Sequence, residues 1–232
     1  MSFTRLVVGL TLGITALSVV TIISRPELIF GESNFRPRVS TSAEPIEIQV
    51  GGKLLSIPSN YIVYEKDRVT NEQDLISLHA LLPDLLPVTE ANKTKFTGRL
   101  DPNVIRIYLR PSQRSYIEGL EARAKLFDKE ISRKAGPFGL TKLELVPLNP
   151  NPKIELFVFQ LSDETEIALE CFIKDDIQIN PTCKTQNNSN GISVGYFFSR
   201  ENLPKFQSIE NGVRNLISTF VVDNPVTIGS TK

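Results

Sequence analysis

The chain has 232 residues, and its 26 basic and 26 acidic side chains give a formal net charge of zero. That balance excludes the strong positive field by which a protein attracts nucleic acid, so we expect no nucleic-acid partner. One histidine and two cysteines are too few ligands for a tetrahedral structural zinc site, and no glycine-rich cradle or dinucleotide fingerprint predicts a cofactor.

The first predicted element is a membrane-spanning helix over residues 6–23, preceded by a short tail at residues 1–5. The run contains no ionisable side chain, and as an α-helix it covers roughly 27 Å, close to the hydrocarbon thickness of a bilayer. The alternative is a cleaved signal peptide, whose small-x-small site belongs directly after the apolar core. Ala16-Leu17-Ser18 lies inside the run and Gly31-Glu32-Ser33 lies well beyond it. We therefore favour a retained anchor in contact with the lipid bilayer.

The sequence contains two contradictory indications of which side of the membrane the domain faces. Arg25, Arg36 and Arg38 follow the span, and positive flanks favour the cytoplasm. Cys171 and Cys183 are the only cysteines, at a separation that one hairpin can close, and such pairs persist in oxidising compartments. Two buried thiols are the alternative. We give the cysteines more weight and predict a disulfide in an exported domain.

A linker is predicted over residues 24–45, which are rich in Ser, Pro, Arg and Glu and have no apolar period. The globular domain then covers residues 46–223, and residues 224–232 form a C-terminal tail. A β-hairpin opens the domain, because Gly51-Gly52 separates two alternating apolar runs and supplies positive φ without a Cβ penalty. The two runs are Ile46, Ile48, Val50 and Leu54, Leu55, Ile57.

The rest of the domain alternates between strand and helix patterns. Strands are predicted from apolar runs bounded by turn residues, at 61–64, 76–80, 104–110, 140–146, 154–161, 166–173 and 192–198, and the last three are expected to form a meander. Apolar spacings of three and four predict a middle amphipathic helix over residues 114–131 and a closing helix from Pro204 to Phe220. We predict an α+β domain with a largely antiparallel β-sheet, on which the C-terminal helix packs.

Two motifs resemble catalytic ones but have the wrong context. Gly191-Ile192-Ser193-Val194-Gly195 matches the G-x-S-x-G pattern of hydrolases, yet it opens a strand, and no helix follows within reach of Ser193. The only histidine, His79, precedes the serine and lies in an alternating strand. We expect neither residue to be catalytic. The acidic clusters at residues 163–166 and 175–176 lack the spacing of a calcium loop, and turn solvation explains them.

One polar strand face is a candidate binding site. Arg106, Tyr108 and Arg110 alternate with Ile105, Ile107 and Leu109, and Arg114 follows beyond Pro111. Guanidinium groups beside a tyrosine can hold a carboxylate or a phosphate. An ordinary solvated sheet face is the alternative.

Four features of the domain form a recognisable combination: Ser56-Ile57-Pro58-Ser59-Asn60-Tyr61, Leu78-His79-Ala80-Leu81-Leu82-Pro83-Asp84-Leu85, Cys171 with Pro181-x-Cys183, and the final amphipathic helix. In these features the chain resembles, over most of residues 46–222, a loose group of uncharacterised single-span periplasmic proteins of Gram-negative bacteria. The resemblance implies an inner-membrane anchor and a periplasmic domain, and it supplies no catalytic residues. Some small proteins of this build serve as immunity proteins against secreted toxins.

The sequence thus predicts a non-enzymatic, membrane-anchored protein that binds a protein partner. An immunity role is one alternative. A small-ligand binder or an envelope enzyme that uses Arg106, Tyr108 and Arg110 is another, and it requires a concave pocket at that face. A third alternative is structural duty, in which Gly9 and Gly13 pair membrane helices.

Overall fold

The computed structural model describes residues 38–97, 101–126, 130–146, 153–161, 165–173 and 181–222. The predicted span at residues 6–23, the first part of the linker and the tail at residues 224–232 lie outside these ranges. Among the described residues, no helix is both long enough and apolar enough to cross a bilayer. The end of the predicted linker runs along the domain, where Ser59 N donates to Glu44 O at 2.9 Å and Ser59 Oγ donates to Ser42 O at 2.8 Å.

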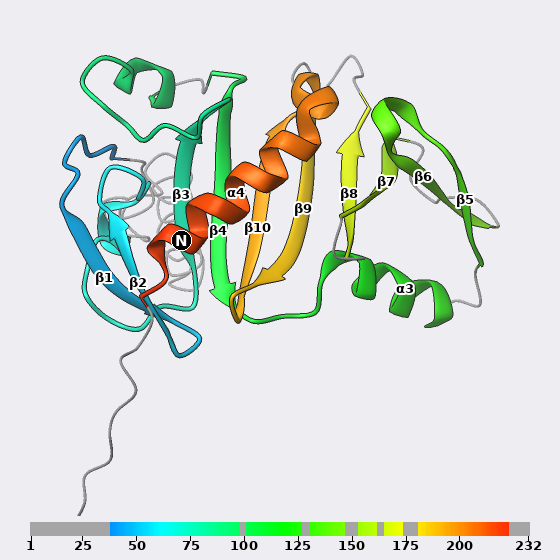
Figure 1. The fold of residues 1–232 in the computed structure, drawn as a ribbon, viewed down its shortest axis with the longest axis horizontal. Helices are drawn as coiled ribbons and strands as arrows, with labels where there is room; N and C mark the ends of the chain where they lie inside the picture. The colour runs from blue at the N-terminus through cyan, green and yellow to red at the C-terminus, as the bar shows by residue number, and fades with distance from the viewer. Residues whose placement is uncertain are drawn as a thin grey trace, which may run out of the picture. The chain divides into compact units, whose positions relative to one another are not determined.

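An antiparallel sheet of eight strands forms the centre of the domain (Figure 1). Its order is β3-β4-β10-β9-β8-β7-β6-β5, so neighbours are mostly also neighbours in sequence, and β10 returns to pair with β4. The strands are β3 (Ile76–Leu81), β4 (Val104–Pro111), β5 (Glu130–Ala135), β6 (Thr141–Val146), β7 (Ile154–Gln160), β8 (Glu166–Phe172), β9 (Thr182–Ser189) and β10 (Ile192–Ser199).

The predicted hairpin is confirmed as a separate two-stranded sheet, β1 (Pro45–Val50) and β2 (Lys53–Pro58). Its turn uses positive φ at both Gly51 (54°) and Gly52 (78°), which few residues with a side chain adopt. A Cβ at Gly51 would also lie 2.8 Å from the Cα of Pro111. This glycine is therefore required both by the turn and by the close approach of β4.

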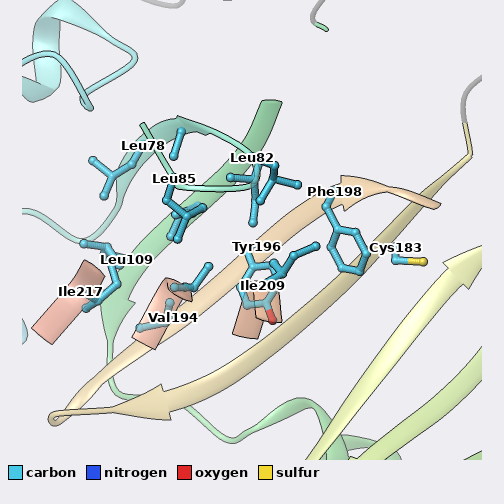
Figure 2. Close-up of a cluster of buried hydrophobic side chains, with 14 of the residues drawn as sticks. Leu78, Leu82, Leu85, Leu109, Cys183, Val194, Tyr196, Phe198, Ile209 and Ile217 are labelled. Atoms are coloured by element: carbon cyan, nitrogen blue, oxygen red, sulfur yellow. The ribbon is translucent and has the colours of Figure 1, made fainter. Parts of the chain in front are cut away.

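The closing helix α4 (Phe206–Phe220) packs on one face of the sheet, as predicted (Figure 1). Its side chains at spacings of three and four are buried against inward residues of β3, β4 and β10, which Figure 2 shows as one cluster. Burial of each large apolar side chain stabilises the fold by about 1.5–3 kcal/mol. The buried apolar residues of α4 are Phe206, Ile209, Val213, Ile217 and Phe220.

The middle helix α3 (Tyr116–Leu126) covers the opposite face, over β5 to β8. Ile117 and Leu120 pack there with Leu143, Leu156 and Val158 in a second hydrophobic cluster. The other helical elements among the described residues are short 3-10 turns: η1 (Glu65–Asp67), η2 (Lys93–Phe96), η3 (Pro137–Gly139) and η4 (Arg200–Lys205). Each long helix thus protects a different half of the sheet on a different face.

The middle helix is shorter than its predicted range of residues 114–131. It ends by Leu126, whose side chain is 77% exposed, and Ile131 belongs instead to the edge strand β5. Ile131 still packs against the cluster beneath α3. The spacing of Ile131 from Phe127 fits a helix, but a single partly buried side chain at that position fits a following strand equally well.

Strand β9 was not predicted, and it separates β8 from β10, so the expected meander of the last three strands is wrong. Its inward residues are Cys183, Thr185 and Asn187, of which only the first is apolar. Hydrophobic alternation therefore gave no signal. The segment at residues 61–64 is not a strand either; it makes one bridge from Ile62 to Leu78 along the outer edge of β3.

The predicted disulfide is confirmed. Cys171 and Cys183 are register partners on β8 and β9, with an S–S distance of 2.03 Å, and both are fully buried. The bridge lies on the α4 side of the sheet, where its sulfurs join the main apolar core (Figure 2). It staples the unpredicted strand to its neighbour.

Candidate functional site

The face of the sheet opposite α4 is covered at both ends and open in the middle. At one end α3 packs over β5 to β8. At the other end, the loop that carries η2 covers β3, where Phe96 stacks on His79 with ring centroids 6.2 Å apart and both side chains are buried. Between these covers, outward side chains of β4, β10 and β9 reach solvent.

We call this open surface the basic trough and define it by six residues. Strand β4 contributes the exposed Arg106 and Arg110 and the half-buried Tyr108. Cross-strand register aligns Tyr108 with Gly195 and then Gln186, and it aligns Arg106 with Phe197. The basic trough therefore consists of Arg106, Tyr108, Arg110, Gln186, Gly195 and Phe197.

The floor of the basic trough is hollowed. A depression of about 230 Å³ lies between Tyr108, Arg110 and Tyr116, the last of which forms a wall from α3. Gly195 is at its centre by register, so the row between Tyr108 and Gln186 has no side chain there. Lys184, Thr185, Ser193 and Phe197 complete the lining. The rings of Phe197 and Tyr108 meet edge to face, with their centroids 5.6 Å apart, and they make part of the floor apolar.

The chain between β4 and α3 forms the rim, and two side chains of β9 hold it. Asn188 Nδ2 donates to Gln113 O at 2.6 Å, and Gln186 Nε2 donates to Arg114 O at 3.3 Å. A second depression of about 170 Å³ continues past Arg114 and shares Tyr116 and Gln186 with the first. The two depressions are therefore neighbours along the rim.

The start of α3 is already capped and is not a free anion site. Ser115 N donates to a Glu118 carboxylate oxygen at 2.7 Å, and Glu118 N donates to Ser115 Oγ at 3.3 Å. This reciprocal pair is a capping box, which satisfies the first amides of a helix. Hydrogen bonds from Ser115 also keep the pKa of Glu118 below its usual value.

The charges around the basic trough are unequal. The carboxylate of Glu170 is taken up by Lys184, at 3.0 Å, and by the hydroxyl of Tyr116. In contrast, the ion pairs found across the described ranges include none made by Arg106, Arg110 or Arg114. Among the residues that the structure describes, Arg106 and Arg110 therefore line β4 without an ion-pair partner, and the charge of Arg114, beyond the end of β4, acts on Glu118 without forming an ion pair.

His79 lies beneath the η2 cover and not in the trough. It is 5% exposed, and burial, together with the nearby charge of Arg106, lowers its pKa to about 4. Its Nδ1 atom has no hydrogen-bond partner among the residues that the structure describes. The imidazole is neutral at physiological pH and packs as an aromatic side chain.

Ser193 is not placed as a nucleophile. It is buried within β10, between Arg110 on β4 and Asn188 on β9, with no strand-to-helix turn. His79 lies two strands away and four register positions along, which separates the two residues by roughly 16 Å in an antiparallel sheet. No proton can pass directly between them.

The predicted acidic clusters lie largely outside the described residues. Within them, Glu166 makes a two-point ion pair with Arg133, at 2.6 and 2.8 Å, which lowers the pKa of Glu166. No group of three potential ligands gathers in a metal-binding arrangement within the parts of the chain that the structure describes.

Sequence reasoning identified the β4 members of the site and missed the others. Lys184 and Gln186 were missed together with β9, although polar residues at alternate positions around Cys183 were the available signal. It also missed a buried polar network on the other face. There, the hydroxyl of Tyr196 donates to Glu210 of α4, and Arg214 Nε donates to Glu210 at 2.7 Å.

No protein-family model matches this chain. No curated protein matches it either. Among solved structures, the fold is similar to Smlt3025, an immunity protein of the Stenotrophomonas maltophilia type IV secretion system, with a TM-score of 0.59 at 16% identity, over 78% of this chain and 95% of that one. It is also similar to FrpD, an iron-regulated outer membrane lipoprotein of Neisseria meningitidis, with a TM-score of 0.54 at 17% identity, over 80% of this chain and 96% of that one. At these identities the likeness establishes a shared fold.

Proposed function

We propose that this protein is a non-enzymatic module that binds a protein partner, anchored in the inner membrane by residues 6–23 with its domain in the periplasm. The observation that carries the proposal is the basic trough, a polar and partly aromatic surface left open between two covered ends of one sheet face. An antiparallel sheet commonly leaves one face in water, but here α3 and the loop that carries η2 cover both ends of that face and leave only the strip over β4, β10 and β9 open. An open strip with unpaired cations is a surface suited to recognition.

The other parts of the proposal rest on independent features. The buried disulfide suits an oxidising compartment, which agrees with a periplasmic domain. The separation of Ser193 from His79 removes the hydrolase interpretation of the G-x-S-x-G pattern. The shared fold with an immunity protein and a lipoprotein of the envelope fits a binding role.

Site-specific cross-linking tests the proposal in cells. A photoreactive amino acid at Tyr108 of the full chain should give a discrete cross-linked protein, and the same residue at Lys205, exposed beside α4, should not. The adducts are to be isolated from detergent-solubilised membranes. If Tyr108 yields no adduct, or the same adducts as Lys205, the trough is not a partner surface.

An immunity role is the specific version of this function, and the fold shared with Smlt3025 favours it. Cells that lack the gene should then be killed by a toxin that a neighbouring cell delivers, and the wild-type gene should restore survival. Full resistance of the deletion strain to its neighbours would contradict the immunity version and leave partner binding intact.

A small-ligand role is the second candidate, because the depression beside Arg110 has about the volume of a small carboxylate or phosphate compound. Thermal unfolding of the full chain in detergent should shift upward with millimolar citrate or inorganic phosphate if the depression binds such compounds. An unchanged midpoint with both would exclude this candidate.

A further inference from the structure

We propose that the basic trough binds an acidic segment of the partner protein in extended conformation, with an acidic residue at each end of a three-point contact and an apolar residue between them. The inference rests on the proposed function and adds the chemistry of the partner. Its pattern is acidic-x-apolar-x-acidic, in which the first, third and fifth side chains face the trough.

The spacing of the trough's own residues sets this pattern. Arg106, Tyr108 and Arg110 project from the same face of β4 at every second position. The two arginines are therefore roughly 13 Å apart along the strand, with the tyrosine midway. An extended segment that runs along β4 presents its first, third and fifth side chains on one face at the same interval.

The central position suits an apolar side chain. The rings of Tyr108 and Phe197 meet edge to face. Gly195 lies between Tyr108 and Gln186 in the register, and its lack of a side chain leaves the floor open. The depression of about 230 Å³ there has room for one large side chain of the partner. Aromatic rings around such a space are the usual anchor of a protein interface.

The end positions suit carboxylates. Arg106 and Arg110 are exposed and make no ion pair across the described ranges, and Arg114 extends the row along the rim. Two carboxylates beside the trough are already bound: Glu170 by Lys184 and Tyr116, and Glu118 by Ser115. Guanidinium groups bind carboxylates through two parallel hydrogen bonds, which gives an acidic segment both affinity and a fixed position.

Acidic protein is favoured over nucleic acid because the positive charge is local. The whole chain has no net charge, whereas nucleic-acid binding surfaces belong to strongly basic domains. Cations at two ends of an aromatic floor match a pair of carboxylates better than they match an evenly charged phosphate backbone.

A short peptide provides the test, because the chain contains no tryptophan. A peptide with the core Glu-Thr-Trp-Thr-Glu reports its own binding through the fluorescence of its indole when it is titrated with the full chain in a non-ionic detergent. The matched peptides are Gln-Thr-Trp-Thr-Gln, without the charges, and Glu-Glu-Trp-Thr-Thr, with the same charges in another order. We expect the first to bind about tenfold more tightly than the Gln peptide at low salt, and more tightly than the reordered one.

Variants of the chain assign the binding to the trough. R106E/R110E should weaken the binding of the Glu peptide at least about tenfold, and K125E/K205E, which changes the same charge at two exposed lysines elsewhere, should not. Gly195→Leu should also weaken it, since the new side chain fills the depression without altering charge. A Cβ at Gly195 makes only ordinary contacts, the nearest at 3.4 Å from Thr185 O, so this variant should stay folded.

Three results would overturn the inference: equal affinity for the Glu and Gln peptides, equal loss in K125E/K205E, or complete displacement by inorganic phosphate at the concentration of the peptide. If the peptide fails while the Tyr108 cross-link to a protein persists, the acidic segment is wrong and the proposed function stands. If the partner cross-links in wild type and is lost in R106E/R110E, both are supported.

Discussion

The two faces of strand β10 show how differently one sheet is used on its two sides. Val194, Tyr196 and Phe198 point toward α4 and are almost completely buried in the main core. Gly195 and Phe197, which alternate with them, face the basic trough and keep contact with solvent. The face toward α4 stabilises the fold through burial, and the face toward the basic trough leaves side chains accessible for binding.

The faces also treat polar groups differently. Under α4, Glu210 is 2% exposed and is satisfied by Tyr196 and Arg214. Burial and the adjacent Glu210 carboxylate raise the pKa of Tyr196 well above its ordinary value. In the trough, Arg106 and Arg110 remain exposed and have no carboxylate partner among the described residues. Buried polar groups under α4 thus have hydrogen-bond partners within the protein, whereas the exposed arginines of the basic trough remain accessible to a ligand.

Neighbouring phenylalanines provide the strongest test of this contrast. Phe198→Ala should lower the free energy of unfolding by about 3–5 kcal/mol, because the ring is 1% exposed and stacks on Phe206. Phe197→Ala should cost about 1 kcal/mol or less, since its ring is only partly buried against Tyr108. Urea denaturation measures both. Equal losses would show that the two faces are equally important for stability.

The disulfide should matter nearly as much as the core ring. The double variant Cys171→Ala/Cys183→Ala should have a free energy of unfolding about 3 kcal/mol lower than wild type, because the bridge closes a loop between residues 12 apart and restricts the unfolded chain. The reducing agent dithiothreitol should lower the unfolding midpoint of wild type and leave the variant unchanged. When intact cells are transferred directly into denaturant, which exposes the buried cysteines, maleimide should label them only after reduction; labelling without reduction would contradict the disulfide.

His79 tests the covered end of the open face. Its folded pKa of about 4 is below its unfolded value of 6.5, so the unfolded chain binds more protons between these pH values. The neutral His79 therefore contributes its full stabilisation of the fold above pH 6.5. As the pH falls toward 4, the free energy of unfolding should decrease on this account by up to about 3 kcal/mol. His79→Phe, which retains stacking on Phe96, should lack this part of the decline. Parallel pH profiles for the two proteins would show that the imidazole is accessible to protons when folded.

The smallest effect on stability is expected in the trough itself. Arg106→Ala and Arg110→Ala should each change the free energy of unfolding by less than about 0.5 kcal/mol, because exposed groups without partners contribute little. The same variants should weaken the cross-link from Tyr108 to its partner. A large loss of stability would instead assign these arginines to the fold.

Local patterns predicted the parts of the fold that depend on near neighbours. The Gly51-Gly52 hairpin, the alternation of β4 and the apolar stripe of α4 were all readable, since each is set by a turn or by a period of two or 3.6. Strand β9 was not, because its inward residues Thr185 and Asn187 are polar and their burial depends on α4 and on neighbouring strands. Strand β5 was hidden by a single apolar residue, Ile131, that also fitted the preceding helix.

That Arg106, Tyr108 and Arg110 share one side of a strand follows from their spacing alone, because side chains of a strand alternate whatever surrounds it. Whether that side is buried or open depends on how the rest of the chain packs. The tertiary structure placed α4 on the opposite face, covered β3 and β8 on this face with η2's loop and α3, and brought Gln186, Gly195 and Phe197 beside β4 through pairings distant in sequence. Those pairings depend on which elements pack together, and that is a property of the whole chain rather than of any local period.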